Sequence, residues 1–467
     1  MLSAGAARPP VTHESDEAWF SRWRQRELGR LDTAGLTYLD YTGATPHPVS
    51  LIRTDSRRLE GAILGNPHSE HLASRHATRD LEAAREAILA FLNADPLEYA
   101  VVLTPNASGG CRLVGEAYPW GPNQPLVLGL DNHNSVNGMA EFARRRGAPV
   151  RVVPLDAELR MAGALEALGE TDGGGGLVAF PAQSNFSGVR HPLSLIAAAQ
   201  SSGYRVLLDA AAFLPTASLD LALVHPDYVA LSIYKIAGYP TGIGALVVRH
   251  DALASLERPW FAGGTVDWVS VGLGRHRLRS GVERFEDGTP PFLAAGAVPE
   301  ALAVVTAADR PRLGRYLVTL STRLLEGLTA LRHGDGRTAV TVHGPQTTVD
   351  RGATVALTLH GADGRSLPYW AVEEAARNRG LAVRGGCFCN PGCAERAFGM
   401  HPALVAPCFE ALGEEFTIPK FAACFGGPVG AVRVSLGLGS ISADVERTLS
   451  FIAELTGAGT DPKLRVA

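Results

Sequence analysis

Two ionisable side chains stand at the ends of predicted buried strands, and their types suit a particular chemistry. The apolar run Arg205–Leu208 leads into Asp209, and Lys235 follows the run Tyr228–Ser232 by three residues. A carboxylate placed there is costly unless a cation or donors compensate it, and a desolvated lysine has a lowered pKa that suits Schiff-base formation. Alone, such an aspartate is more often a helix cap or ion pair, and such a lysine a solvated loop residue. Together they suit pyridoxal phosphate, with the lysine as Schiff-base residue and the aspartate as partner of the ring nitrogen.

Two polar turns supply the other contacts that such a cofactor needs. Thr104-Pro-Asn-Ala-Ser108-Gly-Gly follows the run Val101–Leu103 and precedes a predicted helix. Free backbone N–H groups at a helix start bind phosphate, and Ser108 can add a hydroxyl. The turn Asp131-Asn-His133-Asn-Ser135 places an imidazole where it can stack on a ring. Both patterns are common in ordinary loops and gain weight only beside the lysine and the aspartate.

The six cysteines are distributed unevenly along the chain. Cys387, Cys389 and Cys393 lie within seven residues, whereas the others are scattered, at Cys111, Cys408 and Cys424. Six cysteines in 467 residues are too sparse for a disulfide scaffold, so we expect reduced thiols. The cluster is either a reactive loop or a structural zinc or iron–sulfur site, and three cysteines without a second nearby set make an incomplete metal site. We therefore expect no metal.

Strand-like and helix-like runs alternate around these residues. Alternation over about 200 residues predicts a mainly parallel sheet covered on both faces, with the ligand at the carboxyl ends of the strands. Strands are expected at Val101–Leu103, Leu126–Leu128, Val150–Pro154, Leu177–Phe180, Arg205–Leu208, Tyr228–Ser232 and Gly244–Val248. Helices are expected at Thr78–Leu92, Val136–Arg146, Ala157–Leu168 and Leu193–Ser201.

A second, smaller alternation follows. A long helix is expected from Pro299 to about Leu331, with a possible break, and a last helix near Asp444–Leu455. The stretch Pro402–Pro428 is expected to be an irregular insertion. The predicted organisation is an N-terminal segment (1–35) that packs with the small domain, a large cofactor domain (36–298) and a small domain (299–467) that carries the cysteine loop.

Composition excludes several classes of protein. The chain has 43 basic and 47 acidic residues, a formal charge of −4, which argues against a nucleic-acid binder. The most apolar long stretch, Val206–Val224, is interrupted by charges and a proline, so we expect no membrane span. The first residues do not have the pattern of a secretory signal, and with reduced cysteines the expected location is cytoplasmic.

Six motifs lie in order along nearly the whole chain. They are Tyr38-Leu-Asp-Tyr-Thr-Gly-Ala-Thr45, Gly65-Asn-Pro-His-Ser69, Phe180-Pro-Ala-Gln-Ser-Asn185-Phe-Ser-Gly-Val-Arg190, Ser232-Ile-Tyr-Lys-Ile-Ala-Gly-Tyr-Pro-Thr-Gly-Ile-Gly244, Arg284-Phe-Glu-Asp-Gly-Thr289 and Gly386-Cys-Phe-Cys-Asn-Pro-Gly392. In these motifs the chain resembles the class V aminotransferase branch of fold-type I pyridoxal phosphate enzymes, and within it the sulfurase domain of molybdenum-cofactor sulfurases. The resemblance implies an α/β fold, a large domain with a mainly parallel seven-stranded sheet and a smaller α/β domain.

The resemblance also implies roles for residues around the cofactor. Lys235 matches the Schiff-base lysine, Asp209 the partner of the pyridinium and His133 the stacking histidine. Asn185 matches an asparagine beside the ring hydroxyl and the substrate. Three further residues match phosphate contacts: Ala107, Ser108 and Ser232. The residue three after Asp209, often glutamine in cysteine desulfurases, is Ala212.

Two matches point beyond a single cofactor site. Thr289 matches a phosphate contact that related enzymes take from the partner subunit, so a homodimer is implied. Arg433 matches the arginine that holds the substrate carboxylate, a bidentate task suited to its planar fork.

The cysteine loop bears on the reaction. In cysteine desulfurases a thiolate attacks the sulfur of the substrate and leaves alanine and a persulfide. The aligned cysteine follows an Arg-x-Gly-x-x segment, and Arg384-Gly-Gly-Cys-Phe puts Cys389 in that place. We favour Cys389 over Cys387, and whether Cys387 or Cys393 shares in sulfur transfer stays open.

Three hypotheses follow. The first is a cysteine desulfurase or sulfurtransferase that takes sulfur from L-cysteine or a related amino acid onto Cys389. Arg433 lies 34 residues before the end of the chain, so we expect the acceptor, a molybdenum cofactor or a protein, to be separate. The second keeps the cofactor but is a C–S lyase, epimerase or other side-chain-cleaving enzyme that does not need the cysteine. The third is a non-enzymatic sulfur carrier or metal-binding protein.

Overall fold

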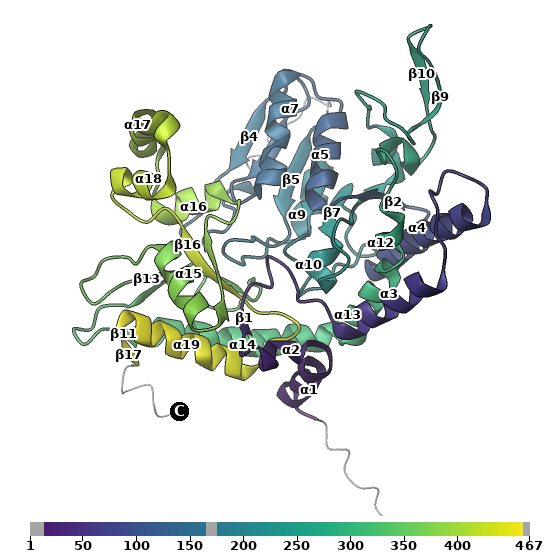
Figure 1. Ribbon diagram of the computed structural model, residues 1–467. Helices are drawn as coiled ribbons and strands as arrows, with labels where there is room; N and C mark the ends of the chain where they lie inside the picture. The colour runs from purple at the N-terminus through teal and green to yellow at the C-terminus, as the bar shows by residue number, and fades with distance from the viewer. Residues whose placement is uncertain (1–13, 165–174, 461–467) are drawn as a thin grey trace, which may run out of the picture.

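Two α/β domains make up the part of the chain that the structure describes. The structure is a computed structural model, and it describes residues 14–164 and 175–460. Helices α13 (Val298–Ala307) and α14 (Arg310–Ala330) join the domains (Figure 1). They form the long helix expected there, and the possible break expected from the sequence lies at residues 308–309.

The large domain is built on a seven-stranded sheet, and all seven strands expected from the sequence are present. Only β8 runs antiparallel to its two neighbours, so the prediction of a mainly parallel sheet is confirmed. The order across the sheet is β2 (Tyr99–Thr104), β8 (Gly244–Arg249), β7 (Tyr228–Ser232), β6 (Arg205–Asp209), β5 (Leu177–Pro181), β3 (Leu126–Gly129) and β4 (Val150–Val153).

Helices cover both faces of this sheet, because successive residues of each strand point to opposite sides. Val206 and Leu208 of β6 belong to one apolar core and Leu207 to the other. The first core includes residues of α4 (Leu72–Phe91), α9 (Ser194–Ser201) and α13. The second includes residues of α5 (Ala107–Ala117) and α7 (Met139–Arg145). All carboxyl ends of the parallel strands therefore meet at one edge of a sandwiched sheet.

The small domain has an antiparallel sheet packed against helices. Its strand order is β12 (Val340–His343), β13 (Thr354–Leu359), β16 (Ala431–Ser435) and β15 (Arg384–Gly386). Helices α14, α15 (Tyr369–Asn378) and α19 (Ser442–Thr456) contribute to its core. The N-terminal helix α1 (Asp16–Leu28) also packs here, where the Phe20 ring stacks on Tyr316 at 4.6 Å and Arg24 pairs with Asp444 at 2.6 Å.

The remaining elements are short or peripheral, and no single helix among the described residues is long and apolar enough to cross a membrane. One bent pair, Phe292–Ala307 and Arg310–Ala330, meets that test by length and composition alone. The other elements are α2 (Arg30–Thr33), β1 (Thr37–Tyr38), α3 (Val49–Gly61), α6 (Asn134–Asn137), α10 (Ile233–Ala237), α11 (His250–Ala254), β9 (Val266–Ser270), β10 (Arg275–Leu278), η1 (Val282–Phe285), α12 (Phe292–Ala295), β11 (Leu331–Arg332), β14 (Leu381–Ala382), α16 (Pro391–Phe398), η2 (Gly413–Glu415) and β17 (Gly459–Thr460).

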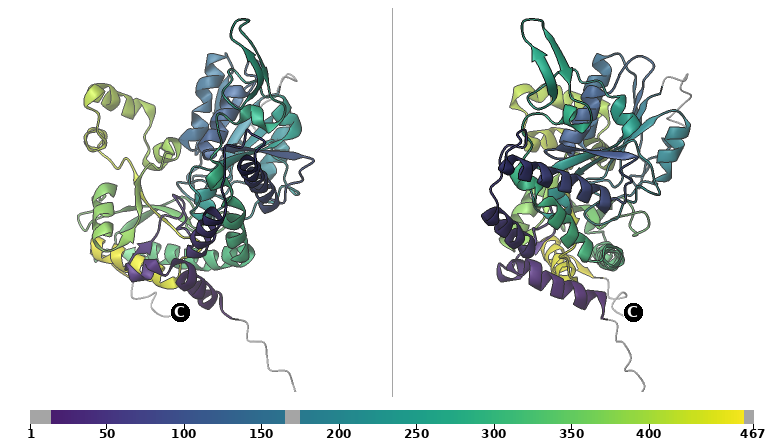
Figure 2. Two further views of the ribbon diagram at one scale, coloured as in Figure 1. Left: turned by 45° about the vertical axis from the view of Figure 1, so that its right-hand side comes forward. Right: turned by 90° about the vertical axis from the view of Figure 1, so that its right-hand side faces the viewer.

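The expected irregular insertion is instead a helical lobe. Residues 402–428 form α17 (Pro402–Leu412) and α18 (Ile418–Phe425), and a disulfide between Cys408 and Cys424 joins them. The prediction was wrong because Pro407 inside α17 and the flanking glycines hide the helical pattern, and α18 buries no residue. The lobe stands away from the body of the molecule (Figures 1 and 2). Its disulfide also corrects the expectation that all six cysteines are reduced.

A third correction concerns the helix expected over Ala157–Leu168. Residues 157–163 form a turn closed by a bridge between Leu155 and Met161, in which Asp156 Oδ1 accepts from the backbone N–H of Glu158 and Arg160 at 2.8 and 2.9 Å. An aspartate bonded to backbone N–H groups stabilises a turn against a helix. Residues 165–168 lie outside the described part of the chain.

Candidate active site

A pocket opens at the carboxyl ends of the central strands, where the sequence predicted a ligand. Loops and helix starts that follow β2, β3, β5, β6 and β7 form its walls. Seven of the predicted cofactor residues line it together: Ala107, Ser108, His133, Asn185, Asp209, Ser232 and Lys235.

Backbone contacts fix the position of Lys235. It lies on α10, a single turn that begins directly after β7, and the Thr45 hydroxyl donates to its carbonyl oxygen at 2.7 Å. The turn ends at Gly238, whose φ is 77° and where a Cβ atom would lie 2.3 Å from the carbonyl oxygen of Thr45. Only glycine allows both this conformation and this approach. The glycine-rich turn noted in the sequence therefore holds the lysine at the strand end.

The two charges of the pocket are incompletely compensated. Asp209 is 8% exposed, and one of its oxygens accepts a hydrogen bond from Ala211 N at 3.0 Å. Among the described residues the Asp209 carboxylate forms no ion pair. Burial lowers the pKa of Lys235, and the negative charge of Asp209 opposes that shift. Within the described part of the chain, the Asp209 carboxylate is buried but forms no ion pair, not even with the nearby Lys235. Burying a carboxylate in this way is unfavourable unless a bound cation compensates it.

The start of α5 and the end of β7 make a polar cradle. Ser232 Oγ accepts from Ala107 N at 2.8 Å, which ties the helix start to the strand. Asn106 caps the helix through Gly109 N at 3.1 Å, and the hydroxyls of Ser108 and Ser135 lie 2.5 Å apart. Hydroxyls and backbone N–H groups at a helix start are the donors that bind phosphate.

His133 is held by its own turn. Its Nδ1 atom lies 2.9 Å from Ser135 Oγ and accepts from Ser135 N at 3.1 Å. Burial lowers its pKa, with the charge of Asp209 opposing, so the ring is neutral at pH 7. A neutral imidazole is suited to stacking on an aromatic ring.

Arg433 does not stand free for a substrate carboxylate. Its Nη2 atom pairs with Asp40 at 2.7 Å and its Nη1 atom donates to the carbonyl oxygen of Asn185 at 2.9 Å. Asp40 also binds Arg384 at 2.6 Å, so one carboxylate lies between two guanidinium groups. A substrate carboxylate must share or displace Asp40. The sequence contained Asp40 in a motif but gave no sign of this pairing.

The cysteine loop lies at the rim of the pocket. Cys389 is exposed, and its carbonyl oxygen accepts from Asn134 N at 2.8 Å, next to His133. Cys387 is half-buried, and Cys393 is buried near Ser184 and Ser187. Burial raises the pKa of Cys393 well above its ordinary value, and Asp131 adds to the shift. Of the three, Cys389 is the thiol that meets solvent beside the pocket.

Thr289 is the one predicted cofactor residue that the structure places elsewhere. It is exposed, lines a different depression and accepts a hydrogen bond from Asn66 Nδ2 at 3.2 Å. Its match to a contact across subunits stays a prediction. No group of three or more His, Cys, Asp or Glu side chains in residues 14–164 and 175–460 is arranged to hold a metal.

Pyridoxal phosphate fits the residues present. A protonated ring nitrogen supplies the cation that Asp209 lacks, and the cradle at α5 supplies donors for the phosphate. Beside the pocket, the single carboxylate of Asp40 lies between the guanidinium groups of Arg384 and Arg433, which leaves one positive charge for an anionic ligand. The fold and the pocket together define an enzyme of the pyridoxal phosphate-dependent class.

The chain belongs to the class-V aminotransferase family, whose sequence model matches residues 37–448. It is 32% identical to the molybdenum cofactor sulfurase of Solanum lycopersicum, over 92% of this chain and 56% of the tomato protein. The chain thus spans about half the length of the curated relatives it matches.

Solved structures show the same fold. A cysteine desulfurase from Thermococcus onnurineus superposes with a TM-score of 0.74 at 23% identity, over 93% of this chain and 97% of that chain. The cystine C–S lyase C-DES, solved with its product cysteine persulfide, gives 0.67 at 18% identity, over 91% and 98%. The predicted fold-type I architecture is confirmed.

Proposed function

We propose that this chain is a cysteine desulfurase that takes sulfur from L-cysteine onto Cys389, releases alanine and passes the sulfur to a separate acceptor. The observation that carries the proposal is the position of Cys389, an exposed thiol on a loop bonded to the wall of the cofactor pocket. The names of the sequence relatives support sulfur transfer.

The residues around the pocket divide the work. When bound, pyridoxal phosphate supplies an electron sink for the carbon framework of the substrate. Arg433 and Arg384 attract the substrate carboxylate, and Asp209 holds the positive charge on the ring nitrogen. Lys235, whose lowered pKa favours the neutral amine, accepts the proton from Cα of the substrate and returns a proton to carbon.

The sulfur transfer itself balances without an external oxidant. The Cys389 thiolate forms a bond to the sulfur of bound L-cysteine as the Cβ–S bond breaks. The electron pair of that bond stays with the carbon, which gains a proton and leaves as alanine. Cys389 keeps the second sulfur as a persulfide, so L-cysteine and one thiol give alanine and one persulfide.

The acceptor and the assembly are further parts of the proposal. The relatives' names favour a molybdenum cofactor as acceptor, and a protein thiol is the other candidate. We propose a homodimer in which Thr289 of one subunit reaches the phosphate cradle of the other, since Thr289 is exposed and lies outside its own pocket. Light scattering of the purified protein tests the dimer, and a monomer contradicts it.

Mass spectrometry tests the reaction. The cofactor-loaded protein is exposed to L-cysteine without added thiol, weighed intact and then mapped by peptides. We expect one extra sulfur on Cys389, equal alanine, and loss of both in Cys389→Ser but not in the matched variant Cys387→Ser. Undiminished turnover in Cys389→Ser, abolished in Lys235→Ala, contradicts the desulfurase and supports the C–S lyase or epimerase alternative.

A further inference from the structure

Two asparagine side chains hold the cysteine loop against the large domain. Asn390, directly after Cys389, has no exposed surface. Its Nδ2 atom donates to Asp131 O at 2.6 Å and to Asn185 Oδ1 at 2.9 Å. Its Oδ1 atom accepts from Cys393 N at 3.2 Å and so caps α16. Every polar atom of the Asn390 amide is therefore used.

The neighbouring residues are held in the same way. Asn185 Nδ2 donates to Phe388 O at 2.7 Å, and Asn134 N donates to Cys389 O at 2.8 Å. Three consecutive loop residues, 388 to 390, are thus bonded to turns that follow β3 and β5. The side-chain contacts that hold the loop are therefore those of Asn185 and Asn390 with each other and with the carbonyl groups of Phe388 and Asp131.

The loop needs such a restraint. Phe388 and Cys389 have φ values of 56° and 55°, in the left-handed backbone region that residues other than glycine rarely adopt. At Gly392 a Cβ atom would lie 2.2 Å from Leu130 O, so the loop approaches the large domain too closely for any residue but glycine. A conformation of this kind persists only where surrounding contacts enforce it.

We propose that Asn390 is the positioning residue for the Cys389 thiol. Asn390 acts through Asn185, a residue of the pocket wall whose side-chain amide is bonded both to Asn390 and to Phe388 of the loop. The thiol is thereby held at a fixed place relative to the cofactor. The inference deepens the proposed desulfurase function and rests on it for its kinetic part.

Hydrogen exchange without substrate tests the holding role directly. Asn390→Ala is compared with Asn137→Ala, a matched variant that loses one amide-to-carbonyl bond of 3.0 Å in the neighbouring turn. We expect faster exchange across residues 385–393 in Asn390→Ala only. Equal exchange in the two variants overturns the proposal.

The rate of sulfur arrival tests the positioning role. In a single turnover with L-cysteine, Asn390→Ala should load Cys389 about 100-fold more slowly, because a misplacement of about 1 Å costs that much. Cofactor content and the spectral shift on binding L-cysteine should stay as in the wild type, as they should in Asn137→Ala. Unchanged loading in Asn390→Ala overturns the positioning role.

A second variant separates position from folding. Asn390→Asp keeps the oxygen that accepts from Cys393 N. It loses the N–H groups that donate to Asn185 Oδ1 and Asp131 O, and only a protonated aspartic acid at this position can donate again. Its loading rate relative to wild type should rise as the pH falls, and a ratio independent of pH contradicts the role of the donor. No sulfur on wild-type Cys389 would refute the desulfurase function, whereas hydrogen exchange still decides whether Asn390 holds the loop.

Discussion

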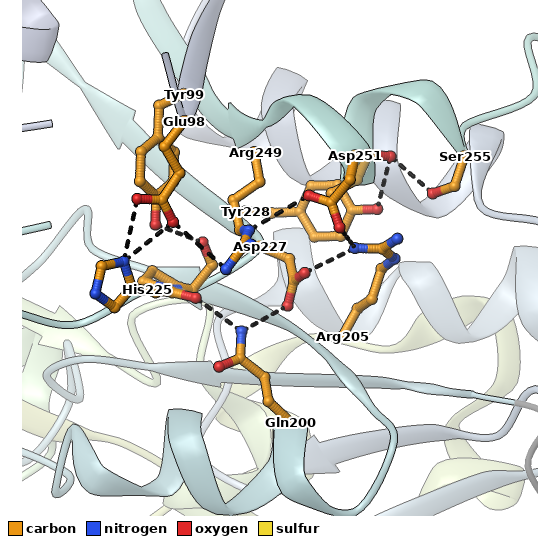
Figure 3. Close-up of polar contacts among 12 residues, drawn as sticks. Glu98, Tyr99, Gln200, Arg205, His225, Asp227, Tyr228, Arg249, Asp251 and Ser255 are labelled. Atoms are coloured by element: carbon orange, nitrogen blue, oxygen red, sulfur yellow. Dashed lines mark hydrogen bonds and ion pairs between the residues drawn. The ribbon is translucent and has the colours of Figure 1, made fainter. Parts of the chain in front are cut away.

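Buried charges are paired within the protein at the amino ends of strands β6 and β7 and, among the residues that the structure describes, are left unpaired at the carboxyl ends. At the amino ends, Asp227 accepts from Val206 N at 2.8 Å and from Gln200 Nε2 at 3.1 Å, and it pairs with Arg205 at 2.8 Å (Figure 3). The pairing continues outward, from Arg205 to Asp251 and from Arg249 to Glu98. Within this network each carboxylate has a cation beside it.

At the carboxyl ends the same two strands lead to Asp209 and Lys235. The Asp209 carboxylate accepts a hydrogen bond from Ala211 N, and the part of the chain that the structure describes pairs neither residue with an opposite charge. Both ends lie at the same buried sheet, so burial does not explain the difference. A polar group buried without a partner is unfavourable, and the amino end removes that cost within the protein. At the carboxyl end, that unfavourable free energy is removed only when a ligand binds and supplies the partner.

The largest effect of a substitution at either end of these strands is expected at Lys235. Lys235→Ala should lower alanine formation by at least about 1,000-fold, because no other amine can take its place at the cofactor. Since the lysine has no ion pair to lose, the midpoint of thermal unfolding of the cofactor-free protein should not fall. The exposed pair Lys420–Glu415 gives the control Lys420→Ala, which should keep full activity. An activity loss matched by a stability loss contradicts the assignment.

Asp209→Asn should reduce turnover on the order of 100-fold or more, because a neutral amide does not hold a protonated ring nitrogen. The same change removes a buried, poorly compensated carboxylate, so the free energy of unfolding of the cofactor-free protein should rise slightly. Steady-state kinetics and urea unfolding measure the two effects. Wild-type turnover would show that this carboxylate is structural.

Asp227→Asn is the matched change at the amino end, and the expected effects are reversed. Removing the negative charge that Arg205 and the buried donors share should lower the free energy of unfolding by about 1–3 kcal/mol. Turnover per folded molecule should stay within twofold of wild type. Comparison with Asp209→Asn by the same two measurements sharpens the contrast; equal stability of the two variants contradicts it.

The smallest expected effect is a pH dependence of stability at Lys235 in the cofactor-free protein. Burial holds the pKa of the folded-state lysine below its ordinary value of 10.5. At a pH between the folded-state and the unfolded-state pKa of this lysine, the unfolded chain binds a proton that the folded chain lacks. The free energy of unfolding therefore rises with pH in this range. Lys235→Met should therefore be more stable than wild type at pH 7, with a gap that shrinks as the pH approaches 10. A constant gap in urea unfolding contradicts this.

The sequence was informative where local pattern and residue type sufficed. Strand–helix alternation predicted all seven strands of the large sheet, because strands buried on both faces are apolar throughout and the half-exposed edge strand β4 still has three valines in four residues. Asp209 and Lys235 were notable because an ionisable residue rarely stands at the end of such a strand or in the first turn after it. Both lie in the pocket that the structure shows, with the histidine and serines predicted from neighbouring turns.

The failures came where a proline and glycines hide a helical pattern and where contacts between distant residues decide the outcome. The lobe at 402–428 was predicted to be irregular, and the pairing of Cys408 with Cys424 was not foreseen, since it depends on how α17 and α18 lie together. The ion pair of Arg433 with Asp40 was not foreseen, because the two residues lie 393 positions apart in the chain; the role of Arg433 in binding the substrate carboxylate stays a prediction. Asn390 carried no signal of its own except its place after Cys389.

The sequence by itself determined the family, the strand ends and the kinds of side chain that stand there, because periodicity and residue type are local properties. Only the tertiary structure decided which of those side chains are paired. It placed Asp227 beside a cation and left Asp209 without one, and it bonded three residues of the cysteine loop to turns from two other strands. The reason is that electrostatic compensation and hydrogen bonding depend on distances across the fold, which no stretch of sequence contains.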